Sequence, residues 1–442
     1  MKNIHRSSLI LFLILACVFI FLRNTFSAEP AATASPAAAP PVASPAASPA
    51  ASPAPSSWTD KFEVGYRRGL FFETKDRKYA LKFRLLIQPE YIFQTNNATG
   101  KEDSNTFKIR RAKPSWEGNF FTQDLEYKVQ LNVAVSNFQD MLEDAYIDYR
   151  FFNPLRIQFG QFKIPYNRQY IINPARLEFV DTSLAADEFR FAAADASTTT
   201  TCTFSTGETI TGSGITCGGG AVTTTNPPTY TQRRFAYDTG GMLHGDAFRR
   251  KMEYYVGIFN NAGPNRLDTT LNFIYAGRVL WNILGQYGYS ESDVEFSKNL
   301  SMMLAGSGGY YVQEGTKNKI AMAGAEFGLK YRGASVQSEY YSRNNGVGSG
   351  TSTHDQGYYF QAGYFVIPKH FEIAGRASQI FLAGVNNDKS EFTGCLGYYI
   401  FDHDFKVQTD YSFLVTDVNP AKFAGATQKN DQRVRLQLQA WF

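Results

Sequence analysis

From about residue 80 to the end of the chain, apolar and polar side chains alternate in short runs that turn residues separate. The run from Leu125 to Val133 places Leu, Tyr, Val, Leu and Val on one face and Glu, Lys, Gln and Asn on the other. The run from Arg433 to Phe442 alternates in the same way and stops on an aromatic residue. A period of two predicts strands with one apolar face and one wet face.

This pattern predicts about sixteen strands after a short prelude at 62–66 and 70–74. The expected strands cover 80–94, 107–120, 125–135, 145–151, 156–162, 235–244, 252–259, 272–280, 299–311, 319–331, 334–342, 356–365, 371–382, 390–400, 405–413 and 433–442. An even number of antiparallel strands favours a closed barrel whose apolar faces meet lipid. The alternative is a soluble β-sandwich, in which the polar faces would meet solvent.

The connections between these strands alternate in length, which separates the two alternatives. Short connections lie at 122–124, 152–154, 332–333, 368–370 and 402–404, and long ones at 95–106, 136–144, 163–234, 260–271, 343–355 and 414–432. The connection at 281–298 is longer than its place in this order predicts. Short periplasmic turns and long extracellular loops are typical of outer-membrane barrels. We therefore expect an all-β fold, a transmembrane antiparallel β-barrel of about 16 strands in the bacterial outer membrane.

The N-terminal residues predict two segments ahead of the barrel. Residues 1–28 begin with Lys2, His5 and Arg6 and continue into an apolar run at 9–22, which is typical of a secretory signal peptide. An uncleaved anchor or a lipoprotein signal are alternatives. Residues 29–57 are almost entirely Ala, Pro and Ser, which predicts a disordered linker, or else an arm that binds a partner. The barrel domain is then expected at 58–442.

Composition supports strands and excludes little else. The chain holds 37 Phe, 26 Tyr and 36 Gly, which suits strands, tight turns and interfacial aromatic belts. The formal charge is +4 for the whole chain, and removal of the three bases in the predicted signal leaves about +1. Overall charge therefore predicts no partner, and any preference for anions has to come from where the bases lie.

The cysteines and the missing motifs argue against metal, cofactor and enzyme sites. Cys202 and Cys217 flank a Gly/Thr/Ser-rich stretch and are expected to pair in an oxidising compartment, whereas Cys395 is expected to be a small packed residue. The sequence has no CxxC pair and no Cys/His cluster with metal spacing, so no metal or cofactor is expected. GxSxG, HExxH and nucleic-acid modules are missing too. A lipase or protease built into a barrel is the minor alternative.

The most basic predicted strand carries a break in its alternation. Trp116 and Pro114 share one parity and Ile109 has the other, so the register slips between Arg110 and Arg111. This predicts a β-bulge that turns both arginines into the lumen. The expected anion pathway begins with these two residues and their basic neighbours in the strand, Lys108 and Lys113. A rim strand whose bases meet lipid headgroups or loop carboxylates is the alternative.

The longest connection, 163–234, is expected to be functional because structureless loops of this length are uncommon inside compact folds. In a wide barrel such a loop can fold inward and narrow the lumen. Its first half carries Lys163, Arg168 and Arg176, which complete the expected anion pathway. Its second half, about 192–231, is rich in Thr and Gly and is expected to be a surface excursion.

Three motifs and the terminal strand resemble the phosphate-selective porin O and P family. They are Arg110-Arg111-Ala112, Glu143-Asp144-Ala145-Tyr146-Ile147-Asp148-Tyr149, Gly160-Gln161-Phe162-Lys163-Ile164-Pro165-Tyr166 and Arg435-Leu436-Gln437. The resemblance covers roughly 78–442 and is sharpest over 107–190. It implies a sixteen-stranded trimeric porin that passes phosphate or polyphosphate along an arginine ladder to a lysine-lined constriction. By motif, Arg110 and Arg111 would belong to the ladder and Lys163 to the constriction.

The chain also departs from that family pattern. It reads Leu177-Glu178-Phe179-Val180 where a Glu-Arg pair is expected in the long loop, and acids accompany bases on the predicted inner face. We therefore expect passive diffusion of small hydrophilic anions, with phosphate as the candidate solute, rather than strict phosphate selectivity. The alternatives are a general, weakly selective porin and a plugged structural or adhesive barrel that acts through its long loop. Expected partners are small anions such as phosphate, outer-membrane lipid and two further copies in a homotrimer, without nucleic acid.

Overall fold

A computed structural model describes the chain from residue 61 onward. The described residues are 61–97, 102–197, 200–204, 208–213, 217, 222–225, 229–268, 271–313, 316–348, 350–383, 388–417 and 429–442. The predicted signal peptide and linker lie outside the described residues. No helix in the described ranges is long and apolar enough to cross a membrane.

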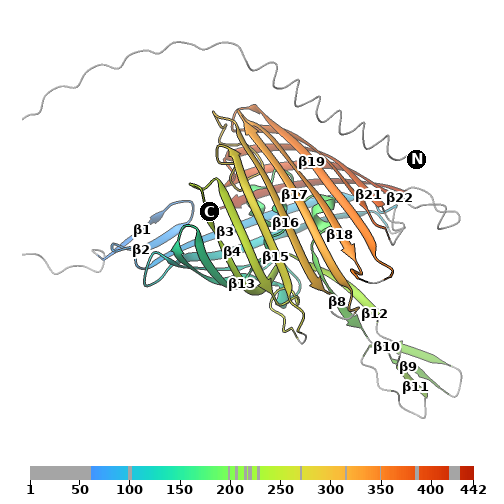
Figure 1. The fold of residues 1–442 in the computed structure, drawn as a ribbon. Coiled ribbons are helices and arrows are strands. Elements are labelled where there is room, and N and C mark those ends of the chain that lie inside the picture. The colour runs from blue at the N-terminus through green and yellow to red at the C-terminus, as the bar shows by residue number, and fades with distance from the viewer. Residues whose placement is uncertain are drawn as a thin grey trace, which may run out of the picture. The chain divides into compact units, whose positions relative to one another are not determined.

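Sixteen antiparallel strands form one closed barrel, as the alternation predicted (Figure 1). They are β3 (Ala80–Gln94), β4 (Ser104–Asn119), β5 (Leu125–Leu131), β6 (Leu142–Phe152), β7 (Leu155–Lys163), β13 (Tyr237–Ala247), β14 (Met252–Phe259), β15 (Ile274–Leu284), β16 (Ser301–Val312), β17 (Lys319–Tyr331), β18 (Ala334–Asn345), β19 (Thr353–Ile367), β20 (Phe371–Phe381), β21 (Asp388–Phe401), β22 (Phe405–Asp417) and β23 (Lys429–Trp441). Each strand pairs with its neighbours in this order. Strand β23 pairs with β3, from Arg433 opposite Gln94 to Trp441 opposite Leu86, and this closes the barrel.

The two faces of the strands divide as the period of two requires. In β23 the side chains of Leu436 and Leu438 are 48% and 42% exposed on the outer wall, whereas Gln437 and Gln439 are buried inside. Exposed outward-facing apolar residues recur around the barrel, for example Ile147, Val279 and Ile373. An apolar outer wall of this kind is typical of barrels whose outer face meets the hydrocarbon of the membrane.

The connections sort by length to the two ends of the barrel. Residues 120–124, 153–154, 248–251, 332–333, 368–370 and 402–404 form short connections at one end. The connections at the other end each span at least six residues, and the one between β7 and β13 is by far the longest. The connection 285–300 is the exception predicted from the sequence, since it lies at the turn end but is long. We call it the turn-side loop.

Some strand ends differ from the predictions, either because polar residues continue a ladder or because the ladder stops while the alternation goes on. Strand β4 begins at Ser104 rather than at 107, because Ser104–Thr106 pairs with Ile92–Gln94. Strand β5 ends at Leu131 rather than at 135. Backbone hydrogen bonds extend a strand beyond the hydrocarbon whatever the side chains are, so alternation alone does not find such ends.

A hairpin precedes the barrel at its turn end. Strands β1 (Phe62–Tyr66) and β2 (Leu70–Thr74) pair with each other, and β2 continues the sheet beside the first residues of β3. The last residue of the chain, Phe442, forms its backbone hydrogen bonds with Leu85, so β23 does not reach the first residues of β3. Strand β2 pairs with β3 along this free edge. The prelude predicted from the sequence is thus an extension of the barrel wall.

The connection between β7 and β13 contains the remaining elements. It holds helices α2 (Arg168–Ile171), η3 (Pro174–Arg176) and α3 (Leu184–Glu188) and the hairpin of β8 (Phe191–Ser197) with β12 (Thr229–Phe235). Strands β9 (Thr200–Thr203), β10 (Thr209–Gly212) and β11 (Val222–Thr225) form a small separate sheet, which fits the predicted surface excursion. The Sγ atoms of Cys202 and Cys217 are bonded there, with their Cα atoms 5.4 Å apart. Elsewhere η2 (Phe138–Asp140) lies between β5 and β6.

Candidate permeation pathway

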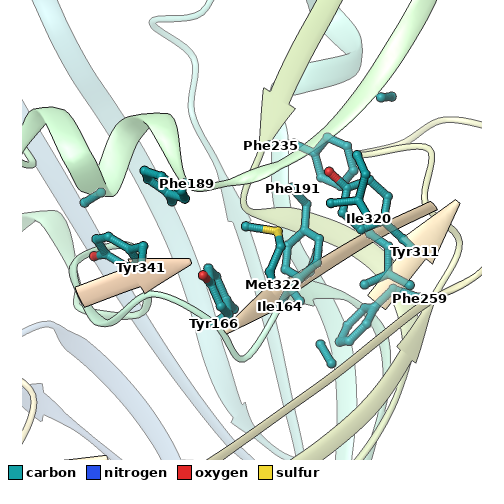
Figure 2. Close-up of a cluster of buried hydrophobic side chains, with 14 of the residues drawn as sticks. Ile164, Tyr166, Phe189, Phe191, Phe235, Phe259, Tyr311, Ile320, Met322 and Tyr341 are labelled. Atoms are coloured by element: carbon teal, nitrogen blue, oxygen red, sulfur yellow. The ribbon is translucent and has the colours of Figure 1, made fainter. Parts of the chain in front are cut away.

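The long loop folds into the barrel on one side of the lumen. We call residues 164–191 the inner segment. Its apolar side chains Ile164, Tyr166, Phe189 and Phe191 pack against inward-facing residues of β14 and β16–β18 (Figure 2). The wall residues of this cluster include Phe259, Tyr311, Ile320, Met322 and Tyr341. Burial of each large side chain contributes roughly 1.5–3 kcal/mol, so this cluster holds the loop firmly inside.

Polar side chains of the barrel wall accept hydrogen bonds from backbone N–H groups of the inner segment. The first N–H groups of a helix lack partners within the helix. Glu339 accepts hydrogen bonds from the backbone N–H groups of Arg168 and Gln169 at 2.8 and 3.2 Å. At α3, the backbone N–H of Leu184 donates to Glu391 at 2.8 Å. Both wall carboxylates therefore lie at helix N-termini, where negative charge is favourable.

The turn-side loop meets the inner segment in the middle of the lumen. Glu291 accepts hydrogen bonds from the side chain of Gln169 and from the backbone N–H of Glu178, both at 2.8 Å. Its own backbone N–H donates to the carbonyl oxygen of Arg176 at 3.1 Å. Lys406 of β22 holds the same stretch by donating to the carbonyl of Leu177 at 2.7 Å. Two loops from opposite ends thus fill the lumen beside β17–β22.

A buried carboxyl group lies where the two loops meet. Burial raises the pKa of Glu178 well above its usual range, and the nearby Glu372 and Glu291 raise it further. Its oxygens accept from Ser335 at 2.7 Å and from Gln361 at 3.0 Å. Gly363 of β19 provides the space for this carboxyl group, because a Cβ atom at position 363 would lie 2.0 Å from a Glu178 oxygen. The surroundings of Glu178 thus favour its neutral form more than water does.

Open space remains on the other side of the lumen, beside β4–β7. Three cavities of about 360, 210 and 20 Å³ lie there, and we call them the outer, middle and inner cavities. Lys163 lines the outer and middle cavities, Lys128 the middle and inner ones, and Lys113 the outer and inner ones. From the inner segment, Asn173 lines the middle and inner cavities and Pro174 lines the outer and middle ones. Each of the three lysines is thus shared by two neighbouring cavities, and we call the region around them the junction.

Basic residues predominate in the outer cavity. Its lining includes seven bases and three acids, namely Arg110, Arg111, Lys113, Lys163, Arg190, Arg233 and Arg234 with Asp140, Glu143 and Asp187. The predicted register slip is present, since Gln88 lies opposite Arg111 and Pro89 opposite Ile109, which leaves Arg110 as the extra residue. The bulge turns both arginines inward, where each forms an ion pair with Asp181, at 2.6 and 2.8 Å.

Carboxylates neutralise most of these bases. Asp181 holds the inner segment to β4, and Arg435 of β23 lies 4.0 Å from it. Burial alone would raise the pKa of Asp181, but Arg111, Arg110 and Arg435 keep it well below its usual range. Two of the three lysines also form ion pairs, Lys113 with Glu143 and Lys128 with Asp144, each at 2.7 Å. The wall is thus densely charged but close to balanced.

Lys163 differs from the other two lysines in its partners. Its ammonium donates to the carbonyl oxygens of Ile171 and Ile172 at 3.2 and 3.0 Å and lies 5.6 Å from the centre of the Tyr237 ring. Within the described ranges no carboxylate lies within 4.0 Å of it. Carbonyl groups solvate an ammonium without cancelling its charge, so Lys163 is the one of the three lysines that no ion pair within the described ranges neutralises.

The predicted site residues fall into two groups. Arg110, Arg111, Lys113 and Lys163 come together around the outer cavity. The remaining three lie elsewhere. Arg168 is buried and donates to Gln337 and to the backbone carbonyl of Gly288, Arg176 lies 5.6 Å from the Trp441 ring, and Lys108 is exposed and 3.8 Å from Glu90. None of these three lines the described cavities, and both loop arginines hold the loops in place.

Sequence reasoning missed Asp181 and Glu291. Asp181 is 70 and 71 residues from the arginines it binds, and nothing in its local sequence indicates a partner in β4. Glu291 lies in the turn-side loop, whose length was greater than its place among the connections predicts, and that length was the available signal. Long-range partners of this kind are set by how a loop enters a barrel, which alternation does not encode.

The fold and these features together define the class. A closed sixteen-stranded barrel with an apolar outer wall, a charged inner wall and a loop that narrows the lumen is an outer-membrane porin of bacteria. Residues 82–237 match the model of the family described as phosphate-selective porin O and P. The matched stretch runs from β3 to the first residue of β13, and it confirms the resemblance seen in the motifs. A comparison with curated protein sequences finds no match.

Solved structures support the same fold at low sequence identity. An anion-selective porin from Comamonas acidovorans is 9% identical, with a TM-score of 0.51 over 82% of this chain and 100% of that chain. The outer membrane channel DcaP of Acinetobacter baumannii is 10% identical, with a TM-score of 0.51 over 84% and 99%. The outer membrane protein OmpT of Vibrio cholerae, in a trimer form, is 12% identical, with a TM-score of 0.50 over 82% and 99%. At these identities the likeness concerns the fold.

Proposed function

We propose that this porin lets small hydrophilic anions diffuse passively along β4–β7, past a junction lined by Lys113, Lys128 and Lys163. The observation that carries the proposal is that these three lysines are shared between successive cavities, while the inner segment and the turn-side loop meet beside β17–β22. An anion that enters a narrow pore loses hydration, and ammonium groups replace part of it. Several moderate sites in series permit passage without trapping.

Phosphate is the candidate solute. The family match over 82–237 favours it, as do the paired arginines at the outer mouth, whose planar donors fit oxyanions. The first measurement is the zero-current potential of the purified barrel in a planar bilayer under a chloride gradient, followed by competition with phosphate. Anion preference with phosphate block of the chloride current is the expected result. Cation preference, or chloride current that phosphate leaves unchanged, would contradict the proposal.

Lys163→Glu tests the junction directly. A unit charge at roughly 4 Å changes the energy of an ion by about 4 kcal/mol at an effective dielectric constant near 20, and salt reduces this. We therefore expect the anion-to-cation permeability ratio to fall by about tenfold. The matched control is Lys369→Glu, in an exposed turn between β19 and β20, which should leave the ratio unchanged. An unaltered reversal potential in the Lys163 variant would remove Lys163 from the pathway.

A general, weakly selective porin is the second candidate. It is favoured by the pairing of Lys113 and Lys128 with carboxylates, which leaves little net charge at the junction. A plugged barrel that acts through its long loop is the third, favoured by the two loops that meet inside the lumen. Sustained conductance separates a channel from a plug, and the permeability ratio separates the two channels.

We also propose a homotrimer, as the structural likeness to a porin solved in a trimer form suggests. The mass of the detergent-solubilised protein, measured by light scattering with the detergent contribution subtracted, tests this assembly. Three chains per particle are expected, and a single chain per particle would contradict it.

A further inference from the structure

The outer wall carries a large apolar groove at the turn end of the barrel. Its volume is about 820 Å³, and it lies between the β1–β2 hairpin and the outward residues of β3–β7. Side chains that line it include Phe62, Phe72, Tyr79, Leu81, Phe120, Tyr127, Val129, Ile147 and Phe159. The hairpin is bound to β3 by a β-ladder, so the groove is built into the sheet.

The groove lies at the level of an aromatic cluster. The rings of Tyr79 and Phe121 are 5.9 Å apart, and those of Phe120 and Tyr127 are 5.7 Å apart. Tyr127 also donates its hydroxyl to the backbone carbonyl of Ala80 at 3.3 Å. Aromatic belts of outer-membrane barrels sit where the hydrocarbon meets the lipid headgroups. The groove therefore begins at headgroup level and continues along the apolar wall.

Basic residues border the headgroup end. Thr74 and Tyr79 line the groove, and the chain between them carries Lys75, Arg77 and Lys78, all exposed. Residues 61–79 hold six bases and three acids in all. Glu73 lies near Arg67 and Arg77, and Asp76 lies 3.9 Å from Lys78. Lys61 is placed beside Lys75, whose backbone N–H donates to the Lys61 carbonyl at 3.1 Å.

We propose that this groove binds an anionic glycerophospholipid, with its acyl chains against the apolar lining and its phosphate near Lys75 and Lys78. The lining suits hydrocarbon because nearly all of its side chains are apolar or aromatic. The basic border complements a negative headgroup, since lysines near a membrane surface attract anionic lipid. The site is independent of the solute that the pore passes.

The test measures lipid bound to the purified full-length protein by native mass spectrometry after equilibration with mixed micelles. The probes are phosphatidylglycerol and phosphatidylcholine with identical acyl chains. We expect the wild type to retain phosphatidylglycerol preferentially. The double variant K75Q/K78Q should lower that retention at least about fivefold. Val129→Trp, which fills the groove from β5, should lower the retention of both lipids.

Matched controls keep the comparison specific. Lys369→Gln removes a base from another turn at the same end, and Val279→Trp adds the same ring to the outer wall of β15. Both should retain lipid like the wild type, and unheated electrophoresis verifies that every variant is folded. Equal retention of the two lipids by the wild type, or unchanged retention in the groove variants, would overturn the proposal. So would a Val129→Trp variant that alters the number of chains per particle but keeps its lipid, since a second copy of the chain would then cover the groove.

Discussion

At the scale of single residues, Asp181 determines how much of the positive charge on strand β4 remains unpaired and available to a solute. It binds Arg110 at 2.6 Å and Arg111 at 2.8 Å, and Arg435 lies 4.0 Å from it. One carboxylate thus lies within 4.0 Å of three guanidinium groups. The basic strand was visible in the sequence, but its neutralisation was not, because the neutralising residue comes from a distant loop.

Asp181→Asn should raise the preference for anions, because it removes one negative charge from a group of three arginines. We expect the permeability ratio to rise roughly threefold, since one screened charge at this distance is worth about 1 kcal/mol or less in a wet pore. The zero-current potential in a planar bilayer measures it. Asp402→Asn, in an exposed turn, is the matched control. A lower anion preference in the Asp181 variant would contradict this account of the outer cavity.

Glu178 should make the anchoring of the inner segment sensitive to pH. Burial, with Glu372 and Glu291 nearby, raises its pKa in the folded protein above that of the unfolded chain, near 4.3. The folded state then binds the proton more tightly, so this group favours folding most at low pH and loses that contribution as pH rises toward the folded pKa. Each unit of pKa difference corresponds to about 1.4 kcal/mol.

Glu178→Gln should therefore flatten the pH dependence of stability relative to the wild type. The measurement is the rate of proteolytic cleavage within the long loop between pH 4 and pH 9, with the variant losing part of the increase that the wild type shows on the alkaline side. Glu208→Gln, an exposed acid of the same loop, should behave like the wild type. Parallel curves for the wild type and the Glu178 variant would show that this carboxyl group does not control the loop.

At the scale of elements, the long loop shapes the lumen rather than the ladder of the barrel. Strands β7 and β13 are direct neighbours, with Lys163 opposite Tyr237, so a hairpin turn could join them. The inner segment of this connection, residues 164–191, instead packs inside the barrel and contributes Asn173 and Pro174 to the junction. The inward-facing side chains of β14–β18 in this region are apolar, and the loop that packs against them keeps them away from water.

Replacing residues 166–234 by a short Gly/Ser turn should raise the single-channel conductance several-fold, because the inner segment no longer fills the lumen. Planar-bilayer recordings of single insertions measure this. Removing residues 198–228 alone, which leaves the β8–β12 hairpin to be closed by a turn, is the matched control, since no described residue of that excursion lines a cavity. Conductance that stays at the wild-type level in the first variant would mean that solute takes another route.

At the scale of the whole molecule, the barrel could be predicted well and the pathway only in part. Alternation with a period of two, an even strand count and alternating connection lengths are local signals, and they located all sixteen strands. The slip at Arg110 and Arg111 was visible because a bulge changes parity within one strand. Lys163 was assigned to the constriction by its motif and Arg168 and Arg176 by composition alone, and of these three only Lys163 lines a described cavity.

By itself, the sequence determined the lipid-facing barrel, because each strand must present apolar side chains to the membrane whatever its neighbours are. It also determined which end carries the turns and which the loops. Only the tertiary structure decided which bases stay uncompensated, since Asp181, Glu143 and Asp144 reach their partners across the lumen or between strands. It likewise decided that the open space runs beside β4–β7, because the packing of two loops against the opposite wall is a long-range contact that no local period records.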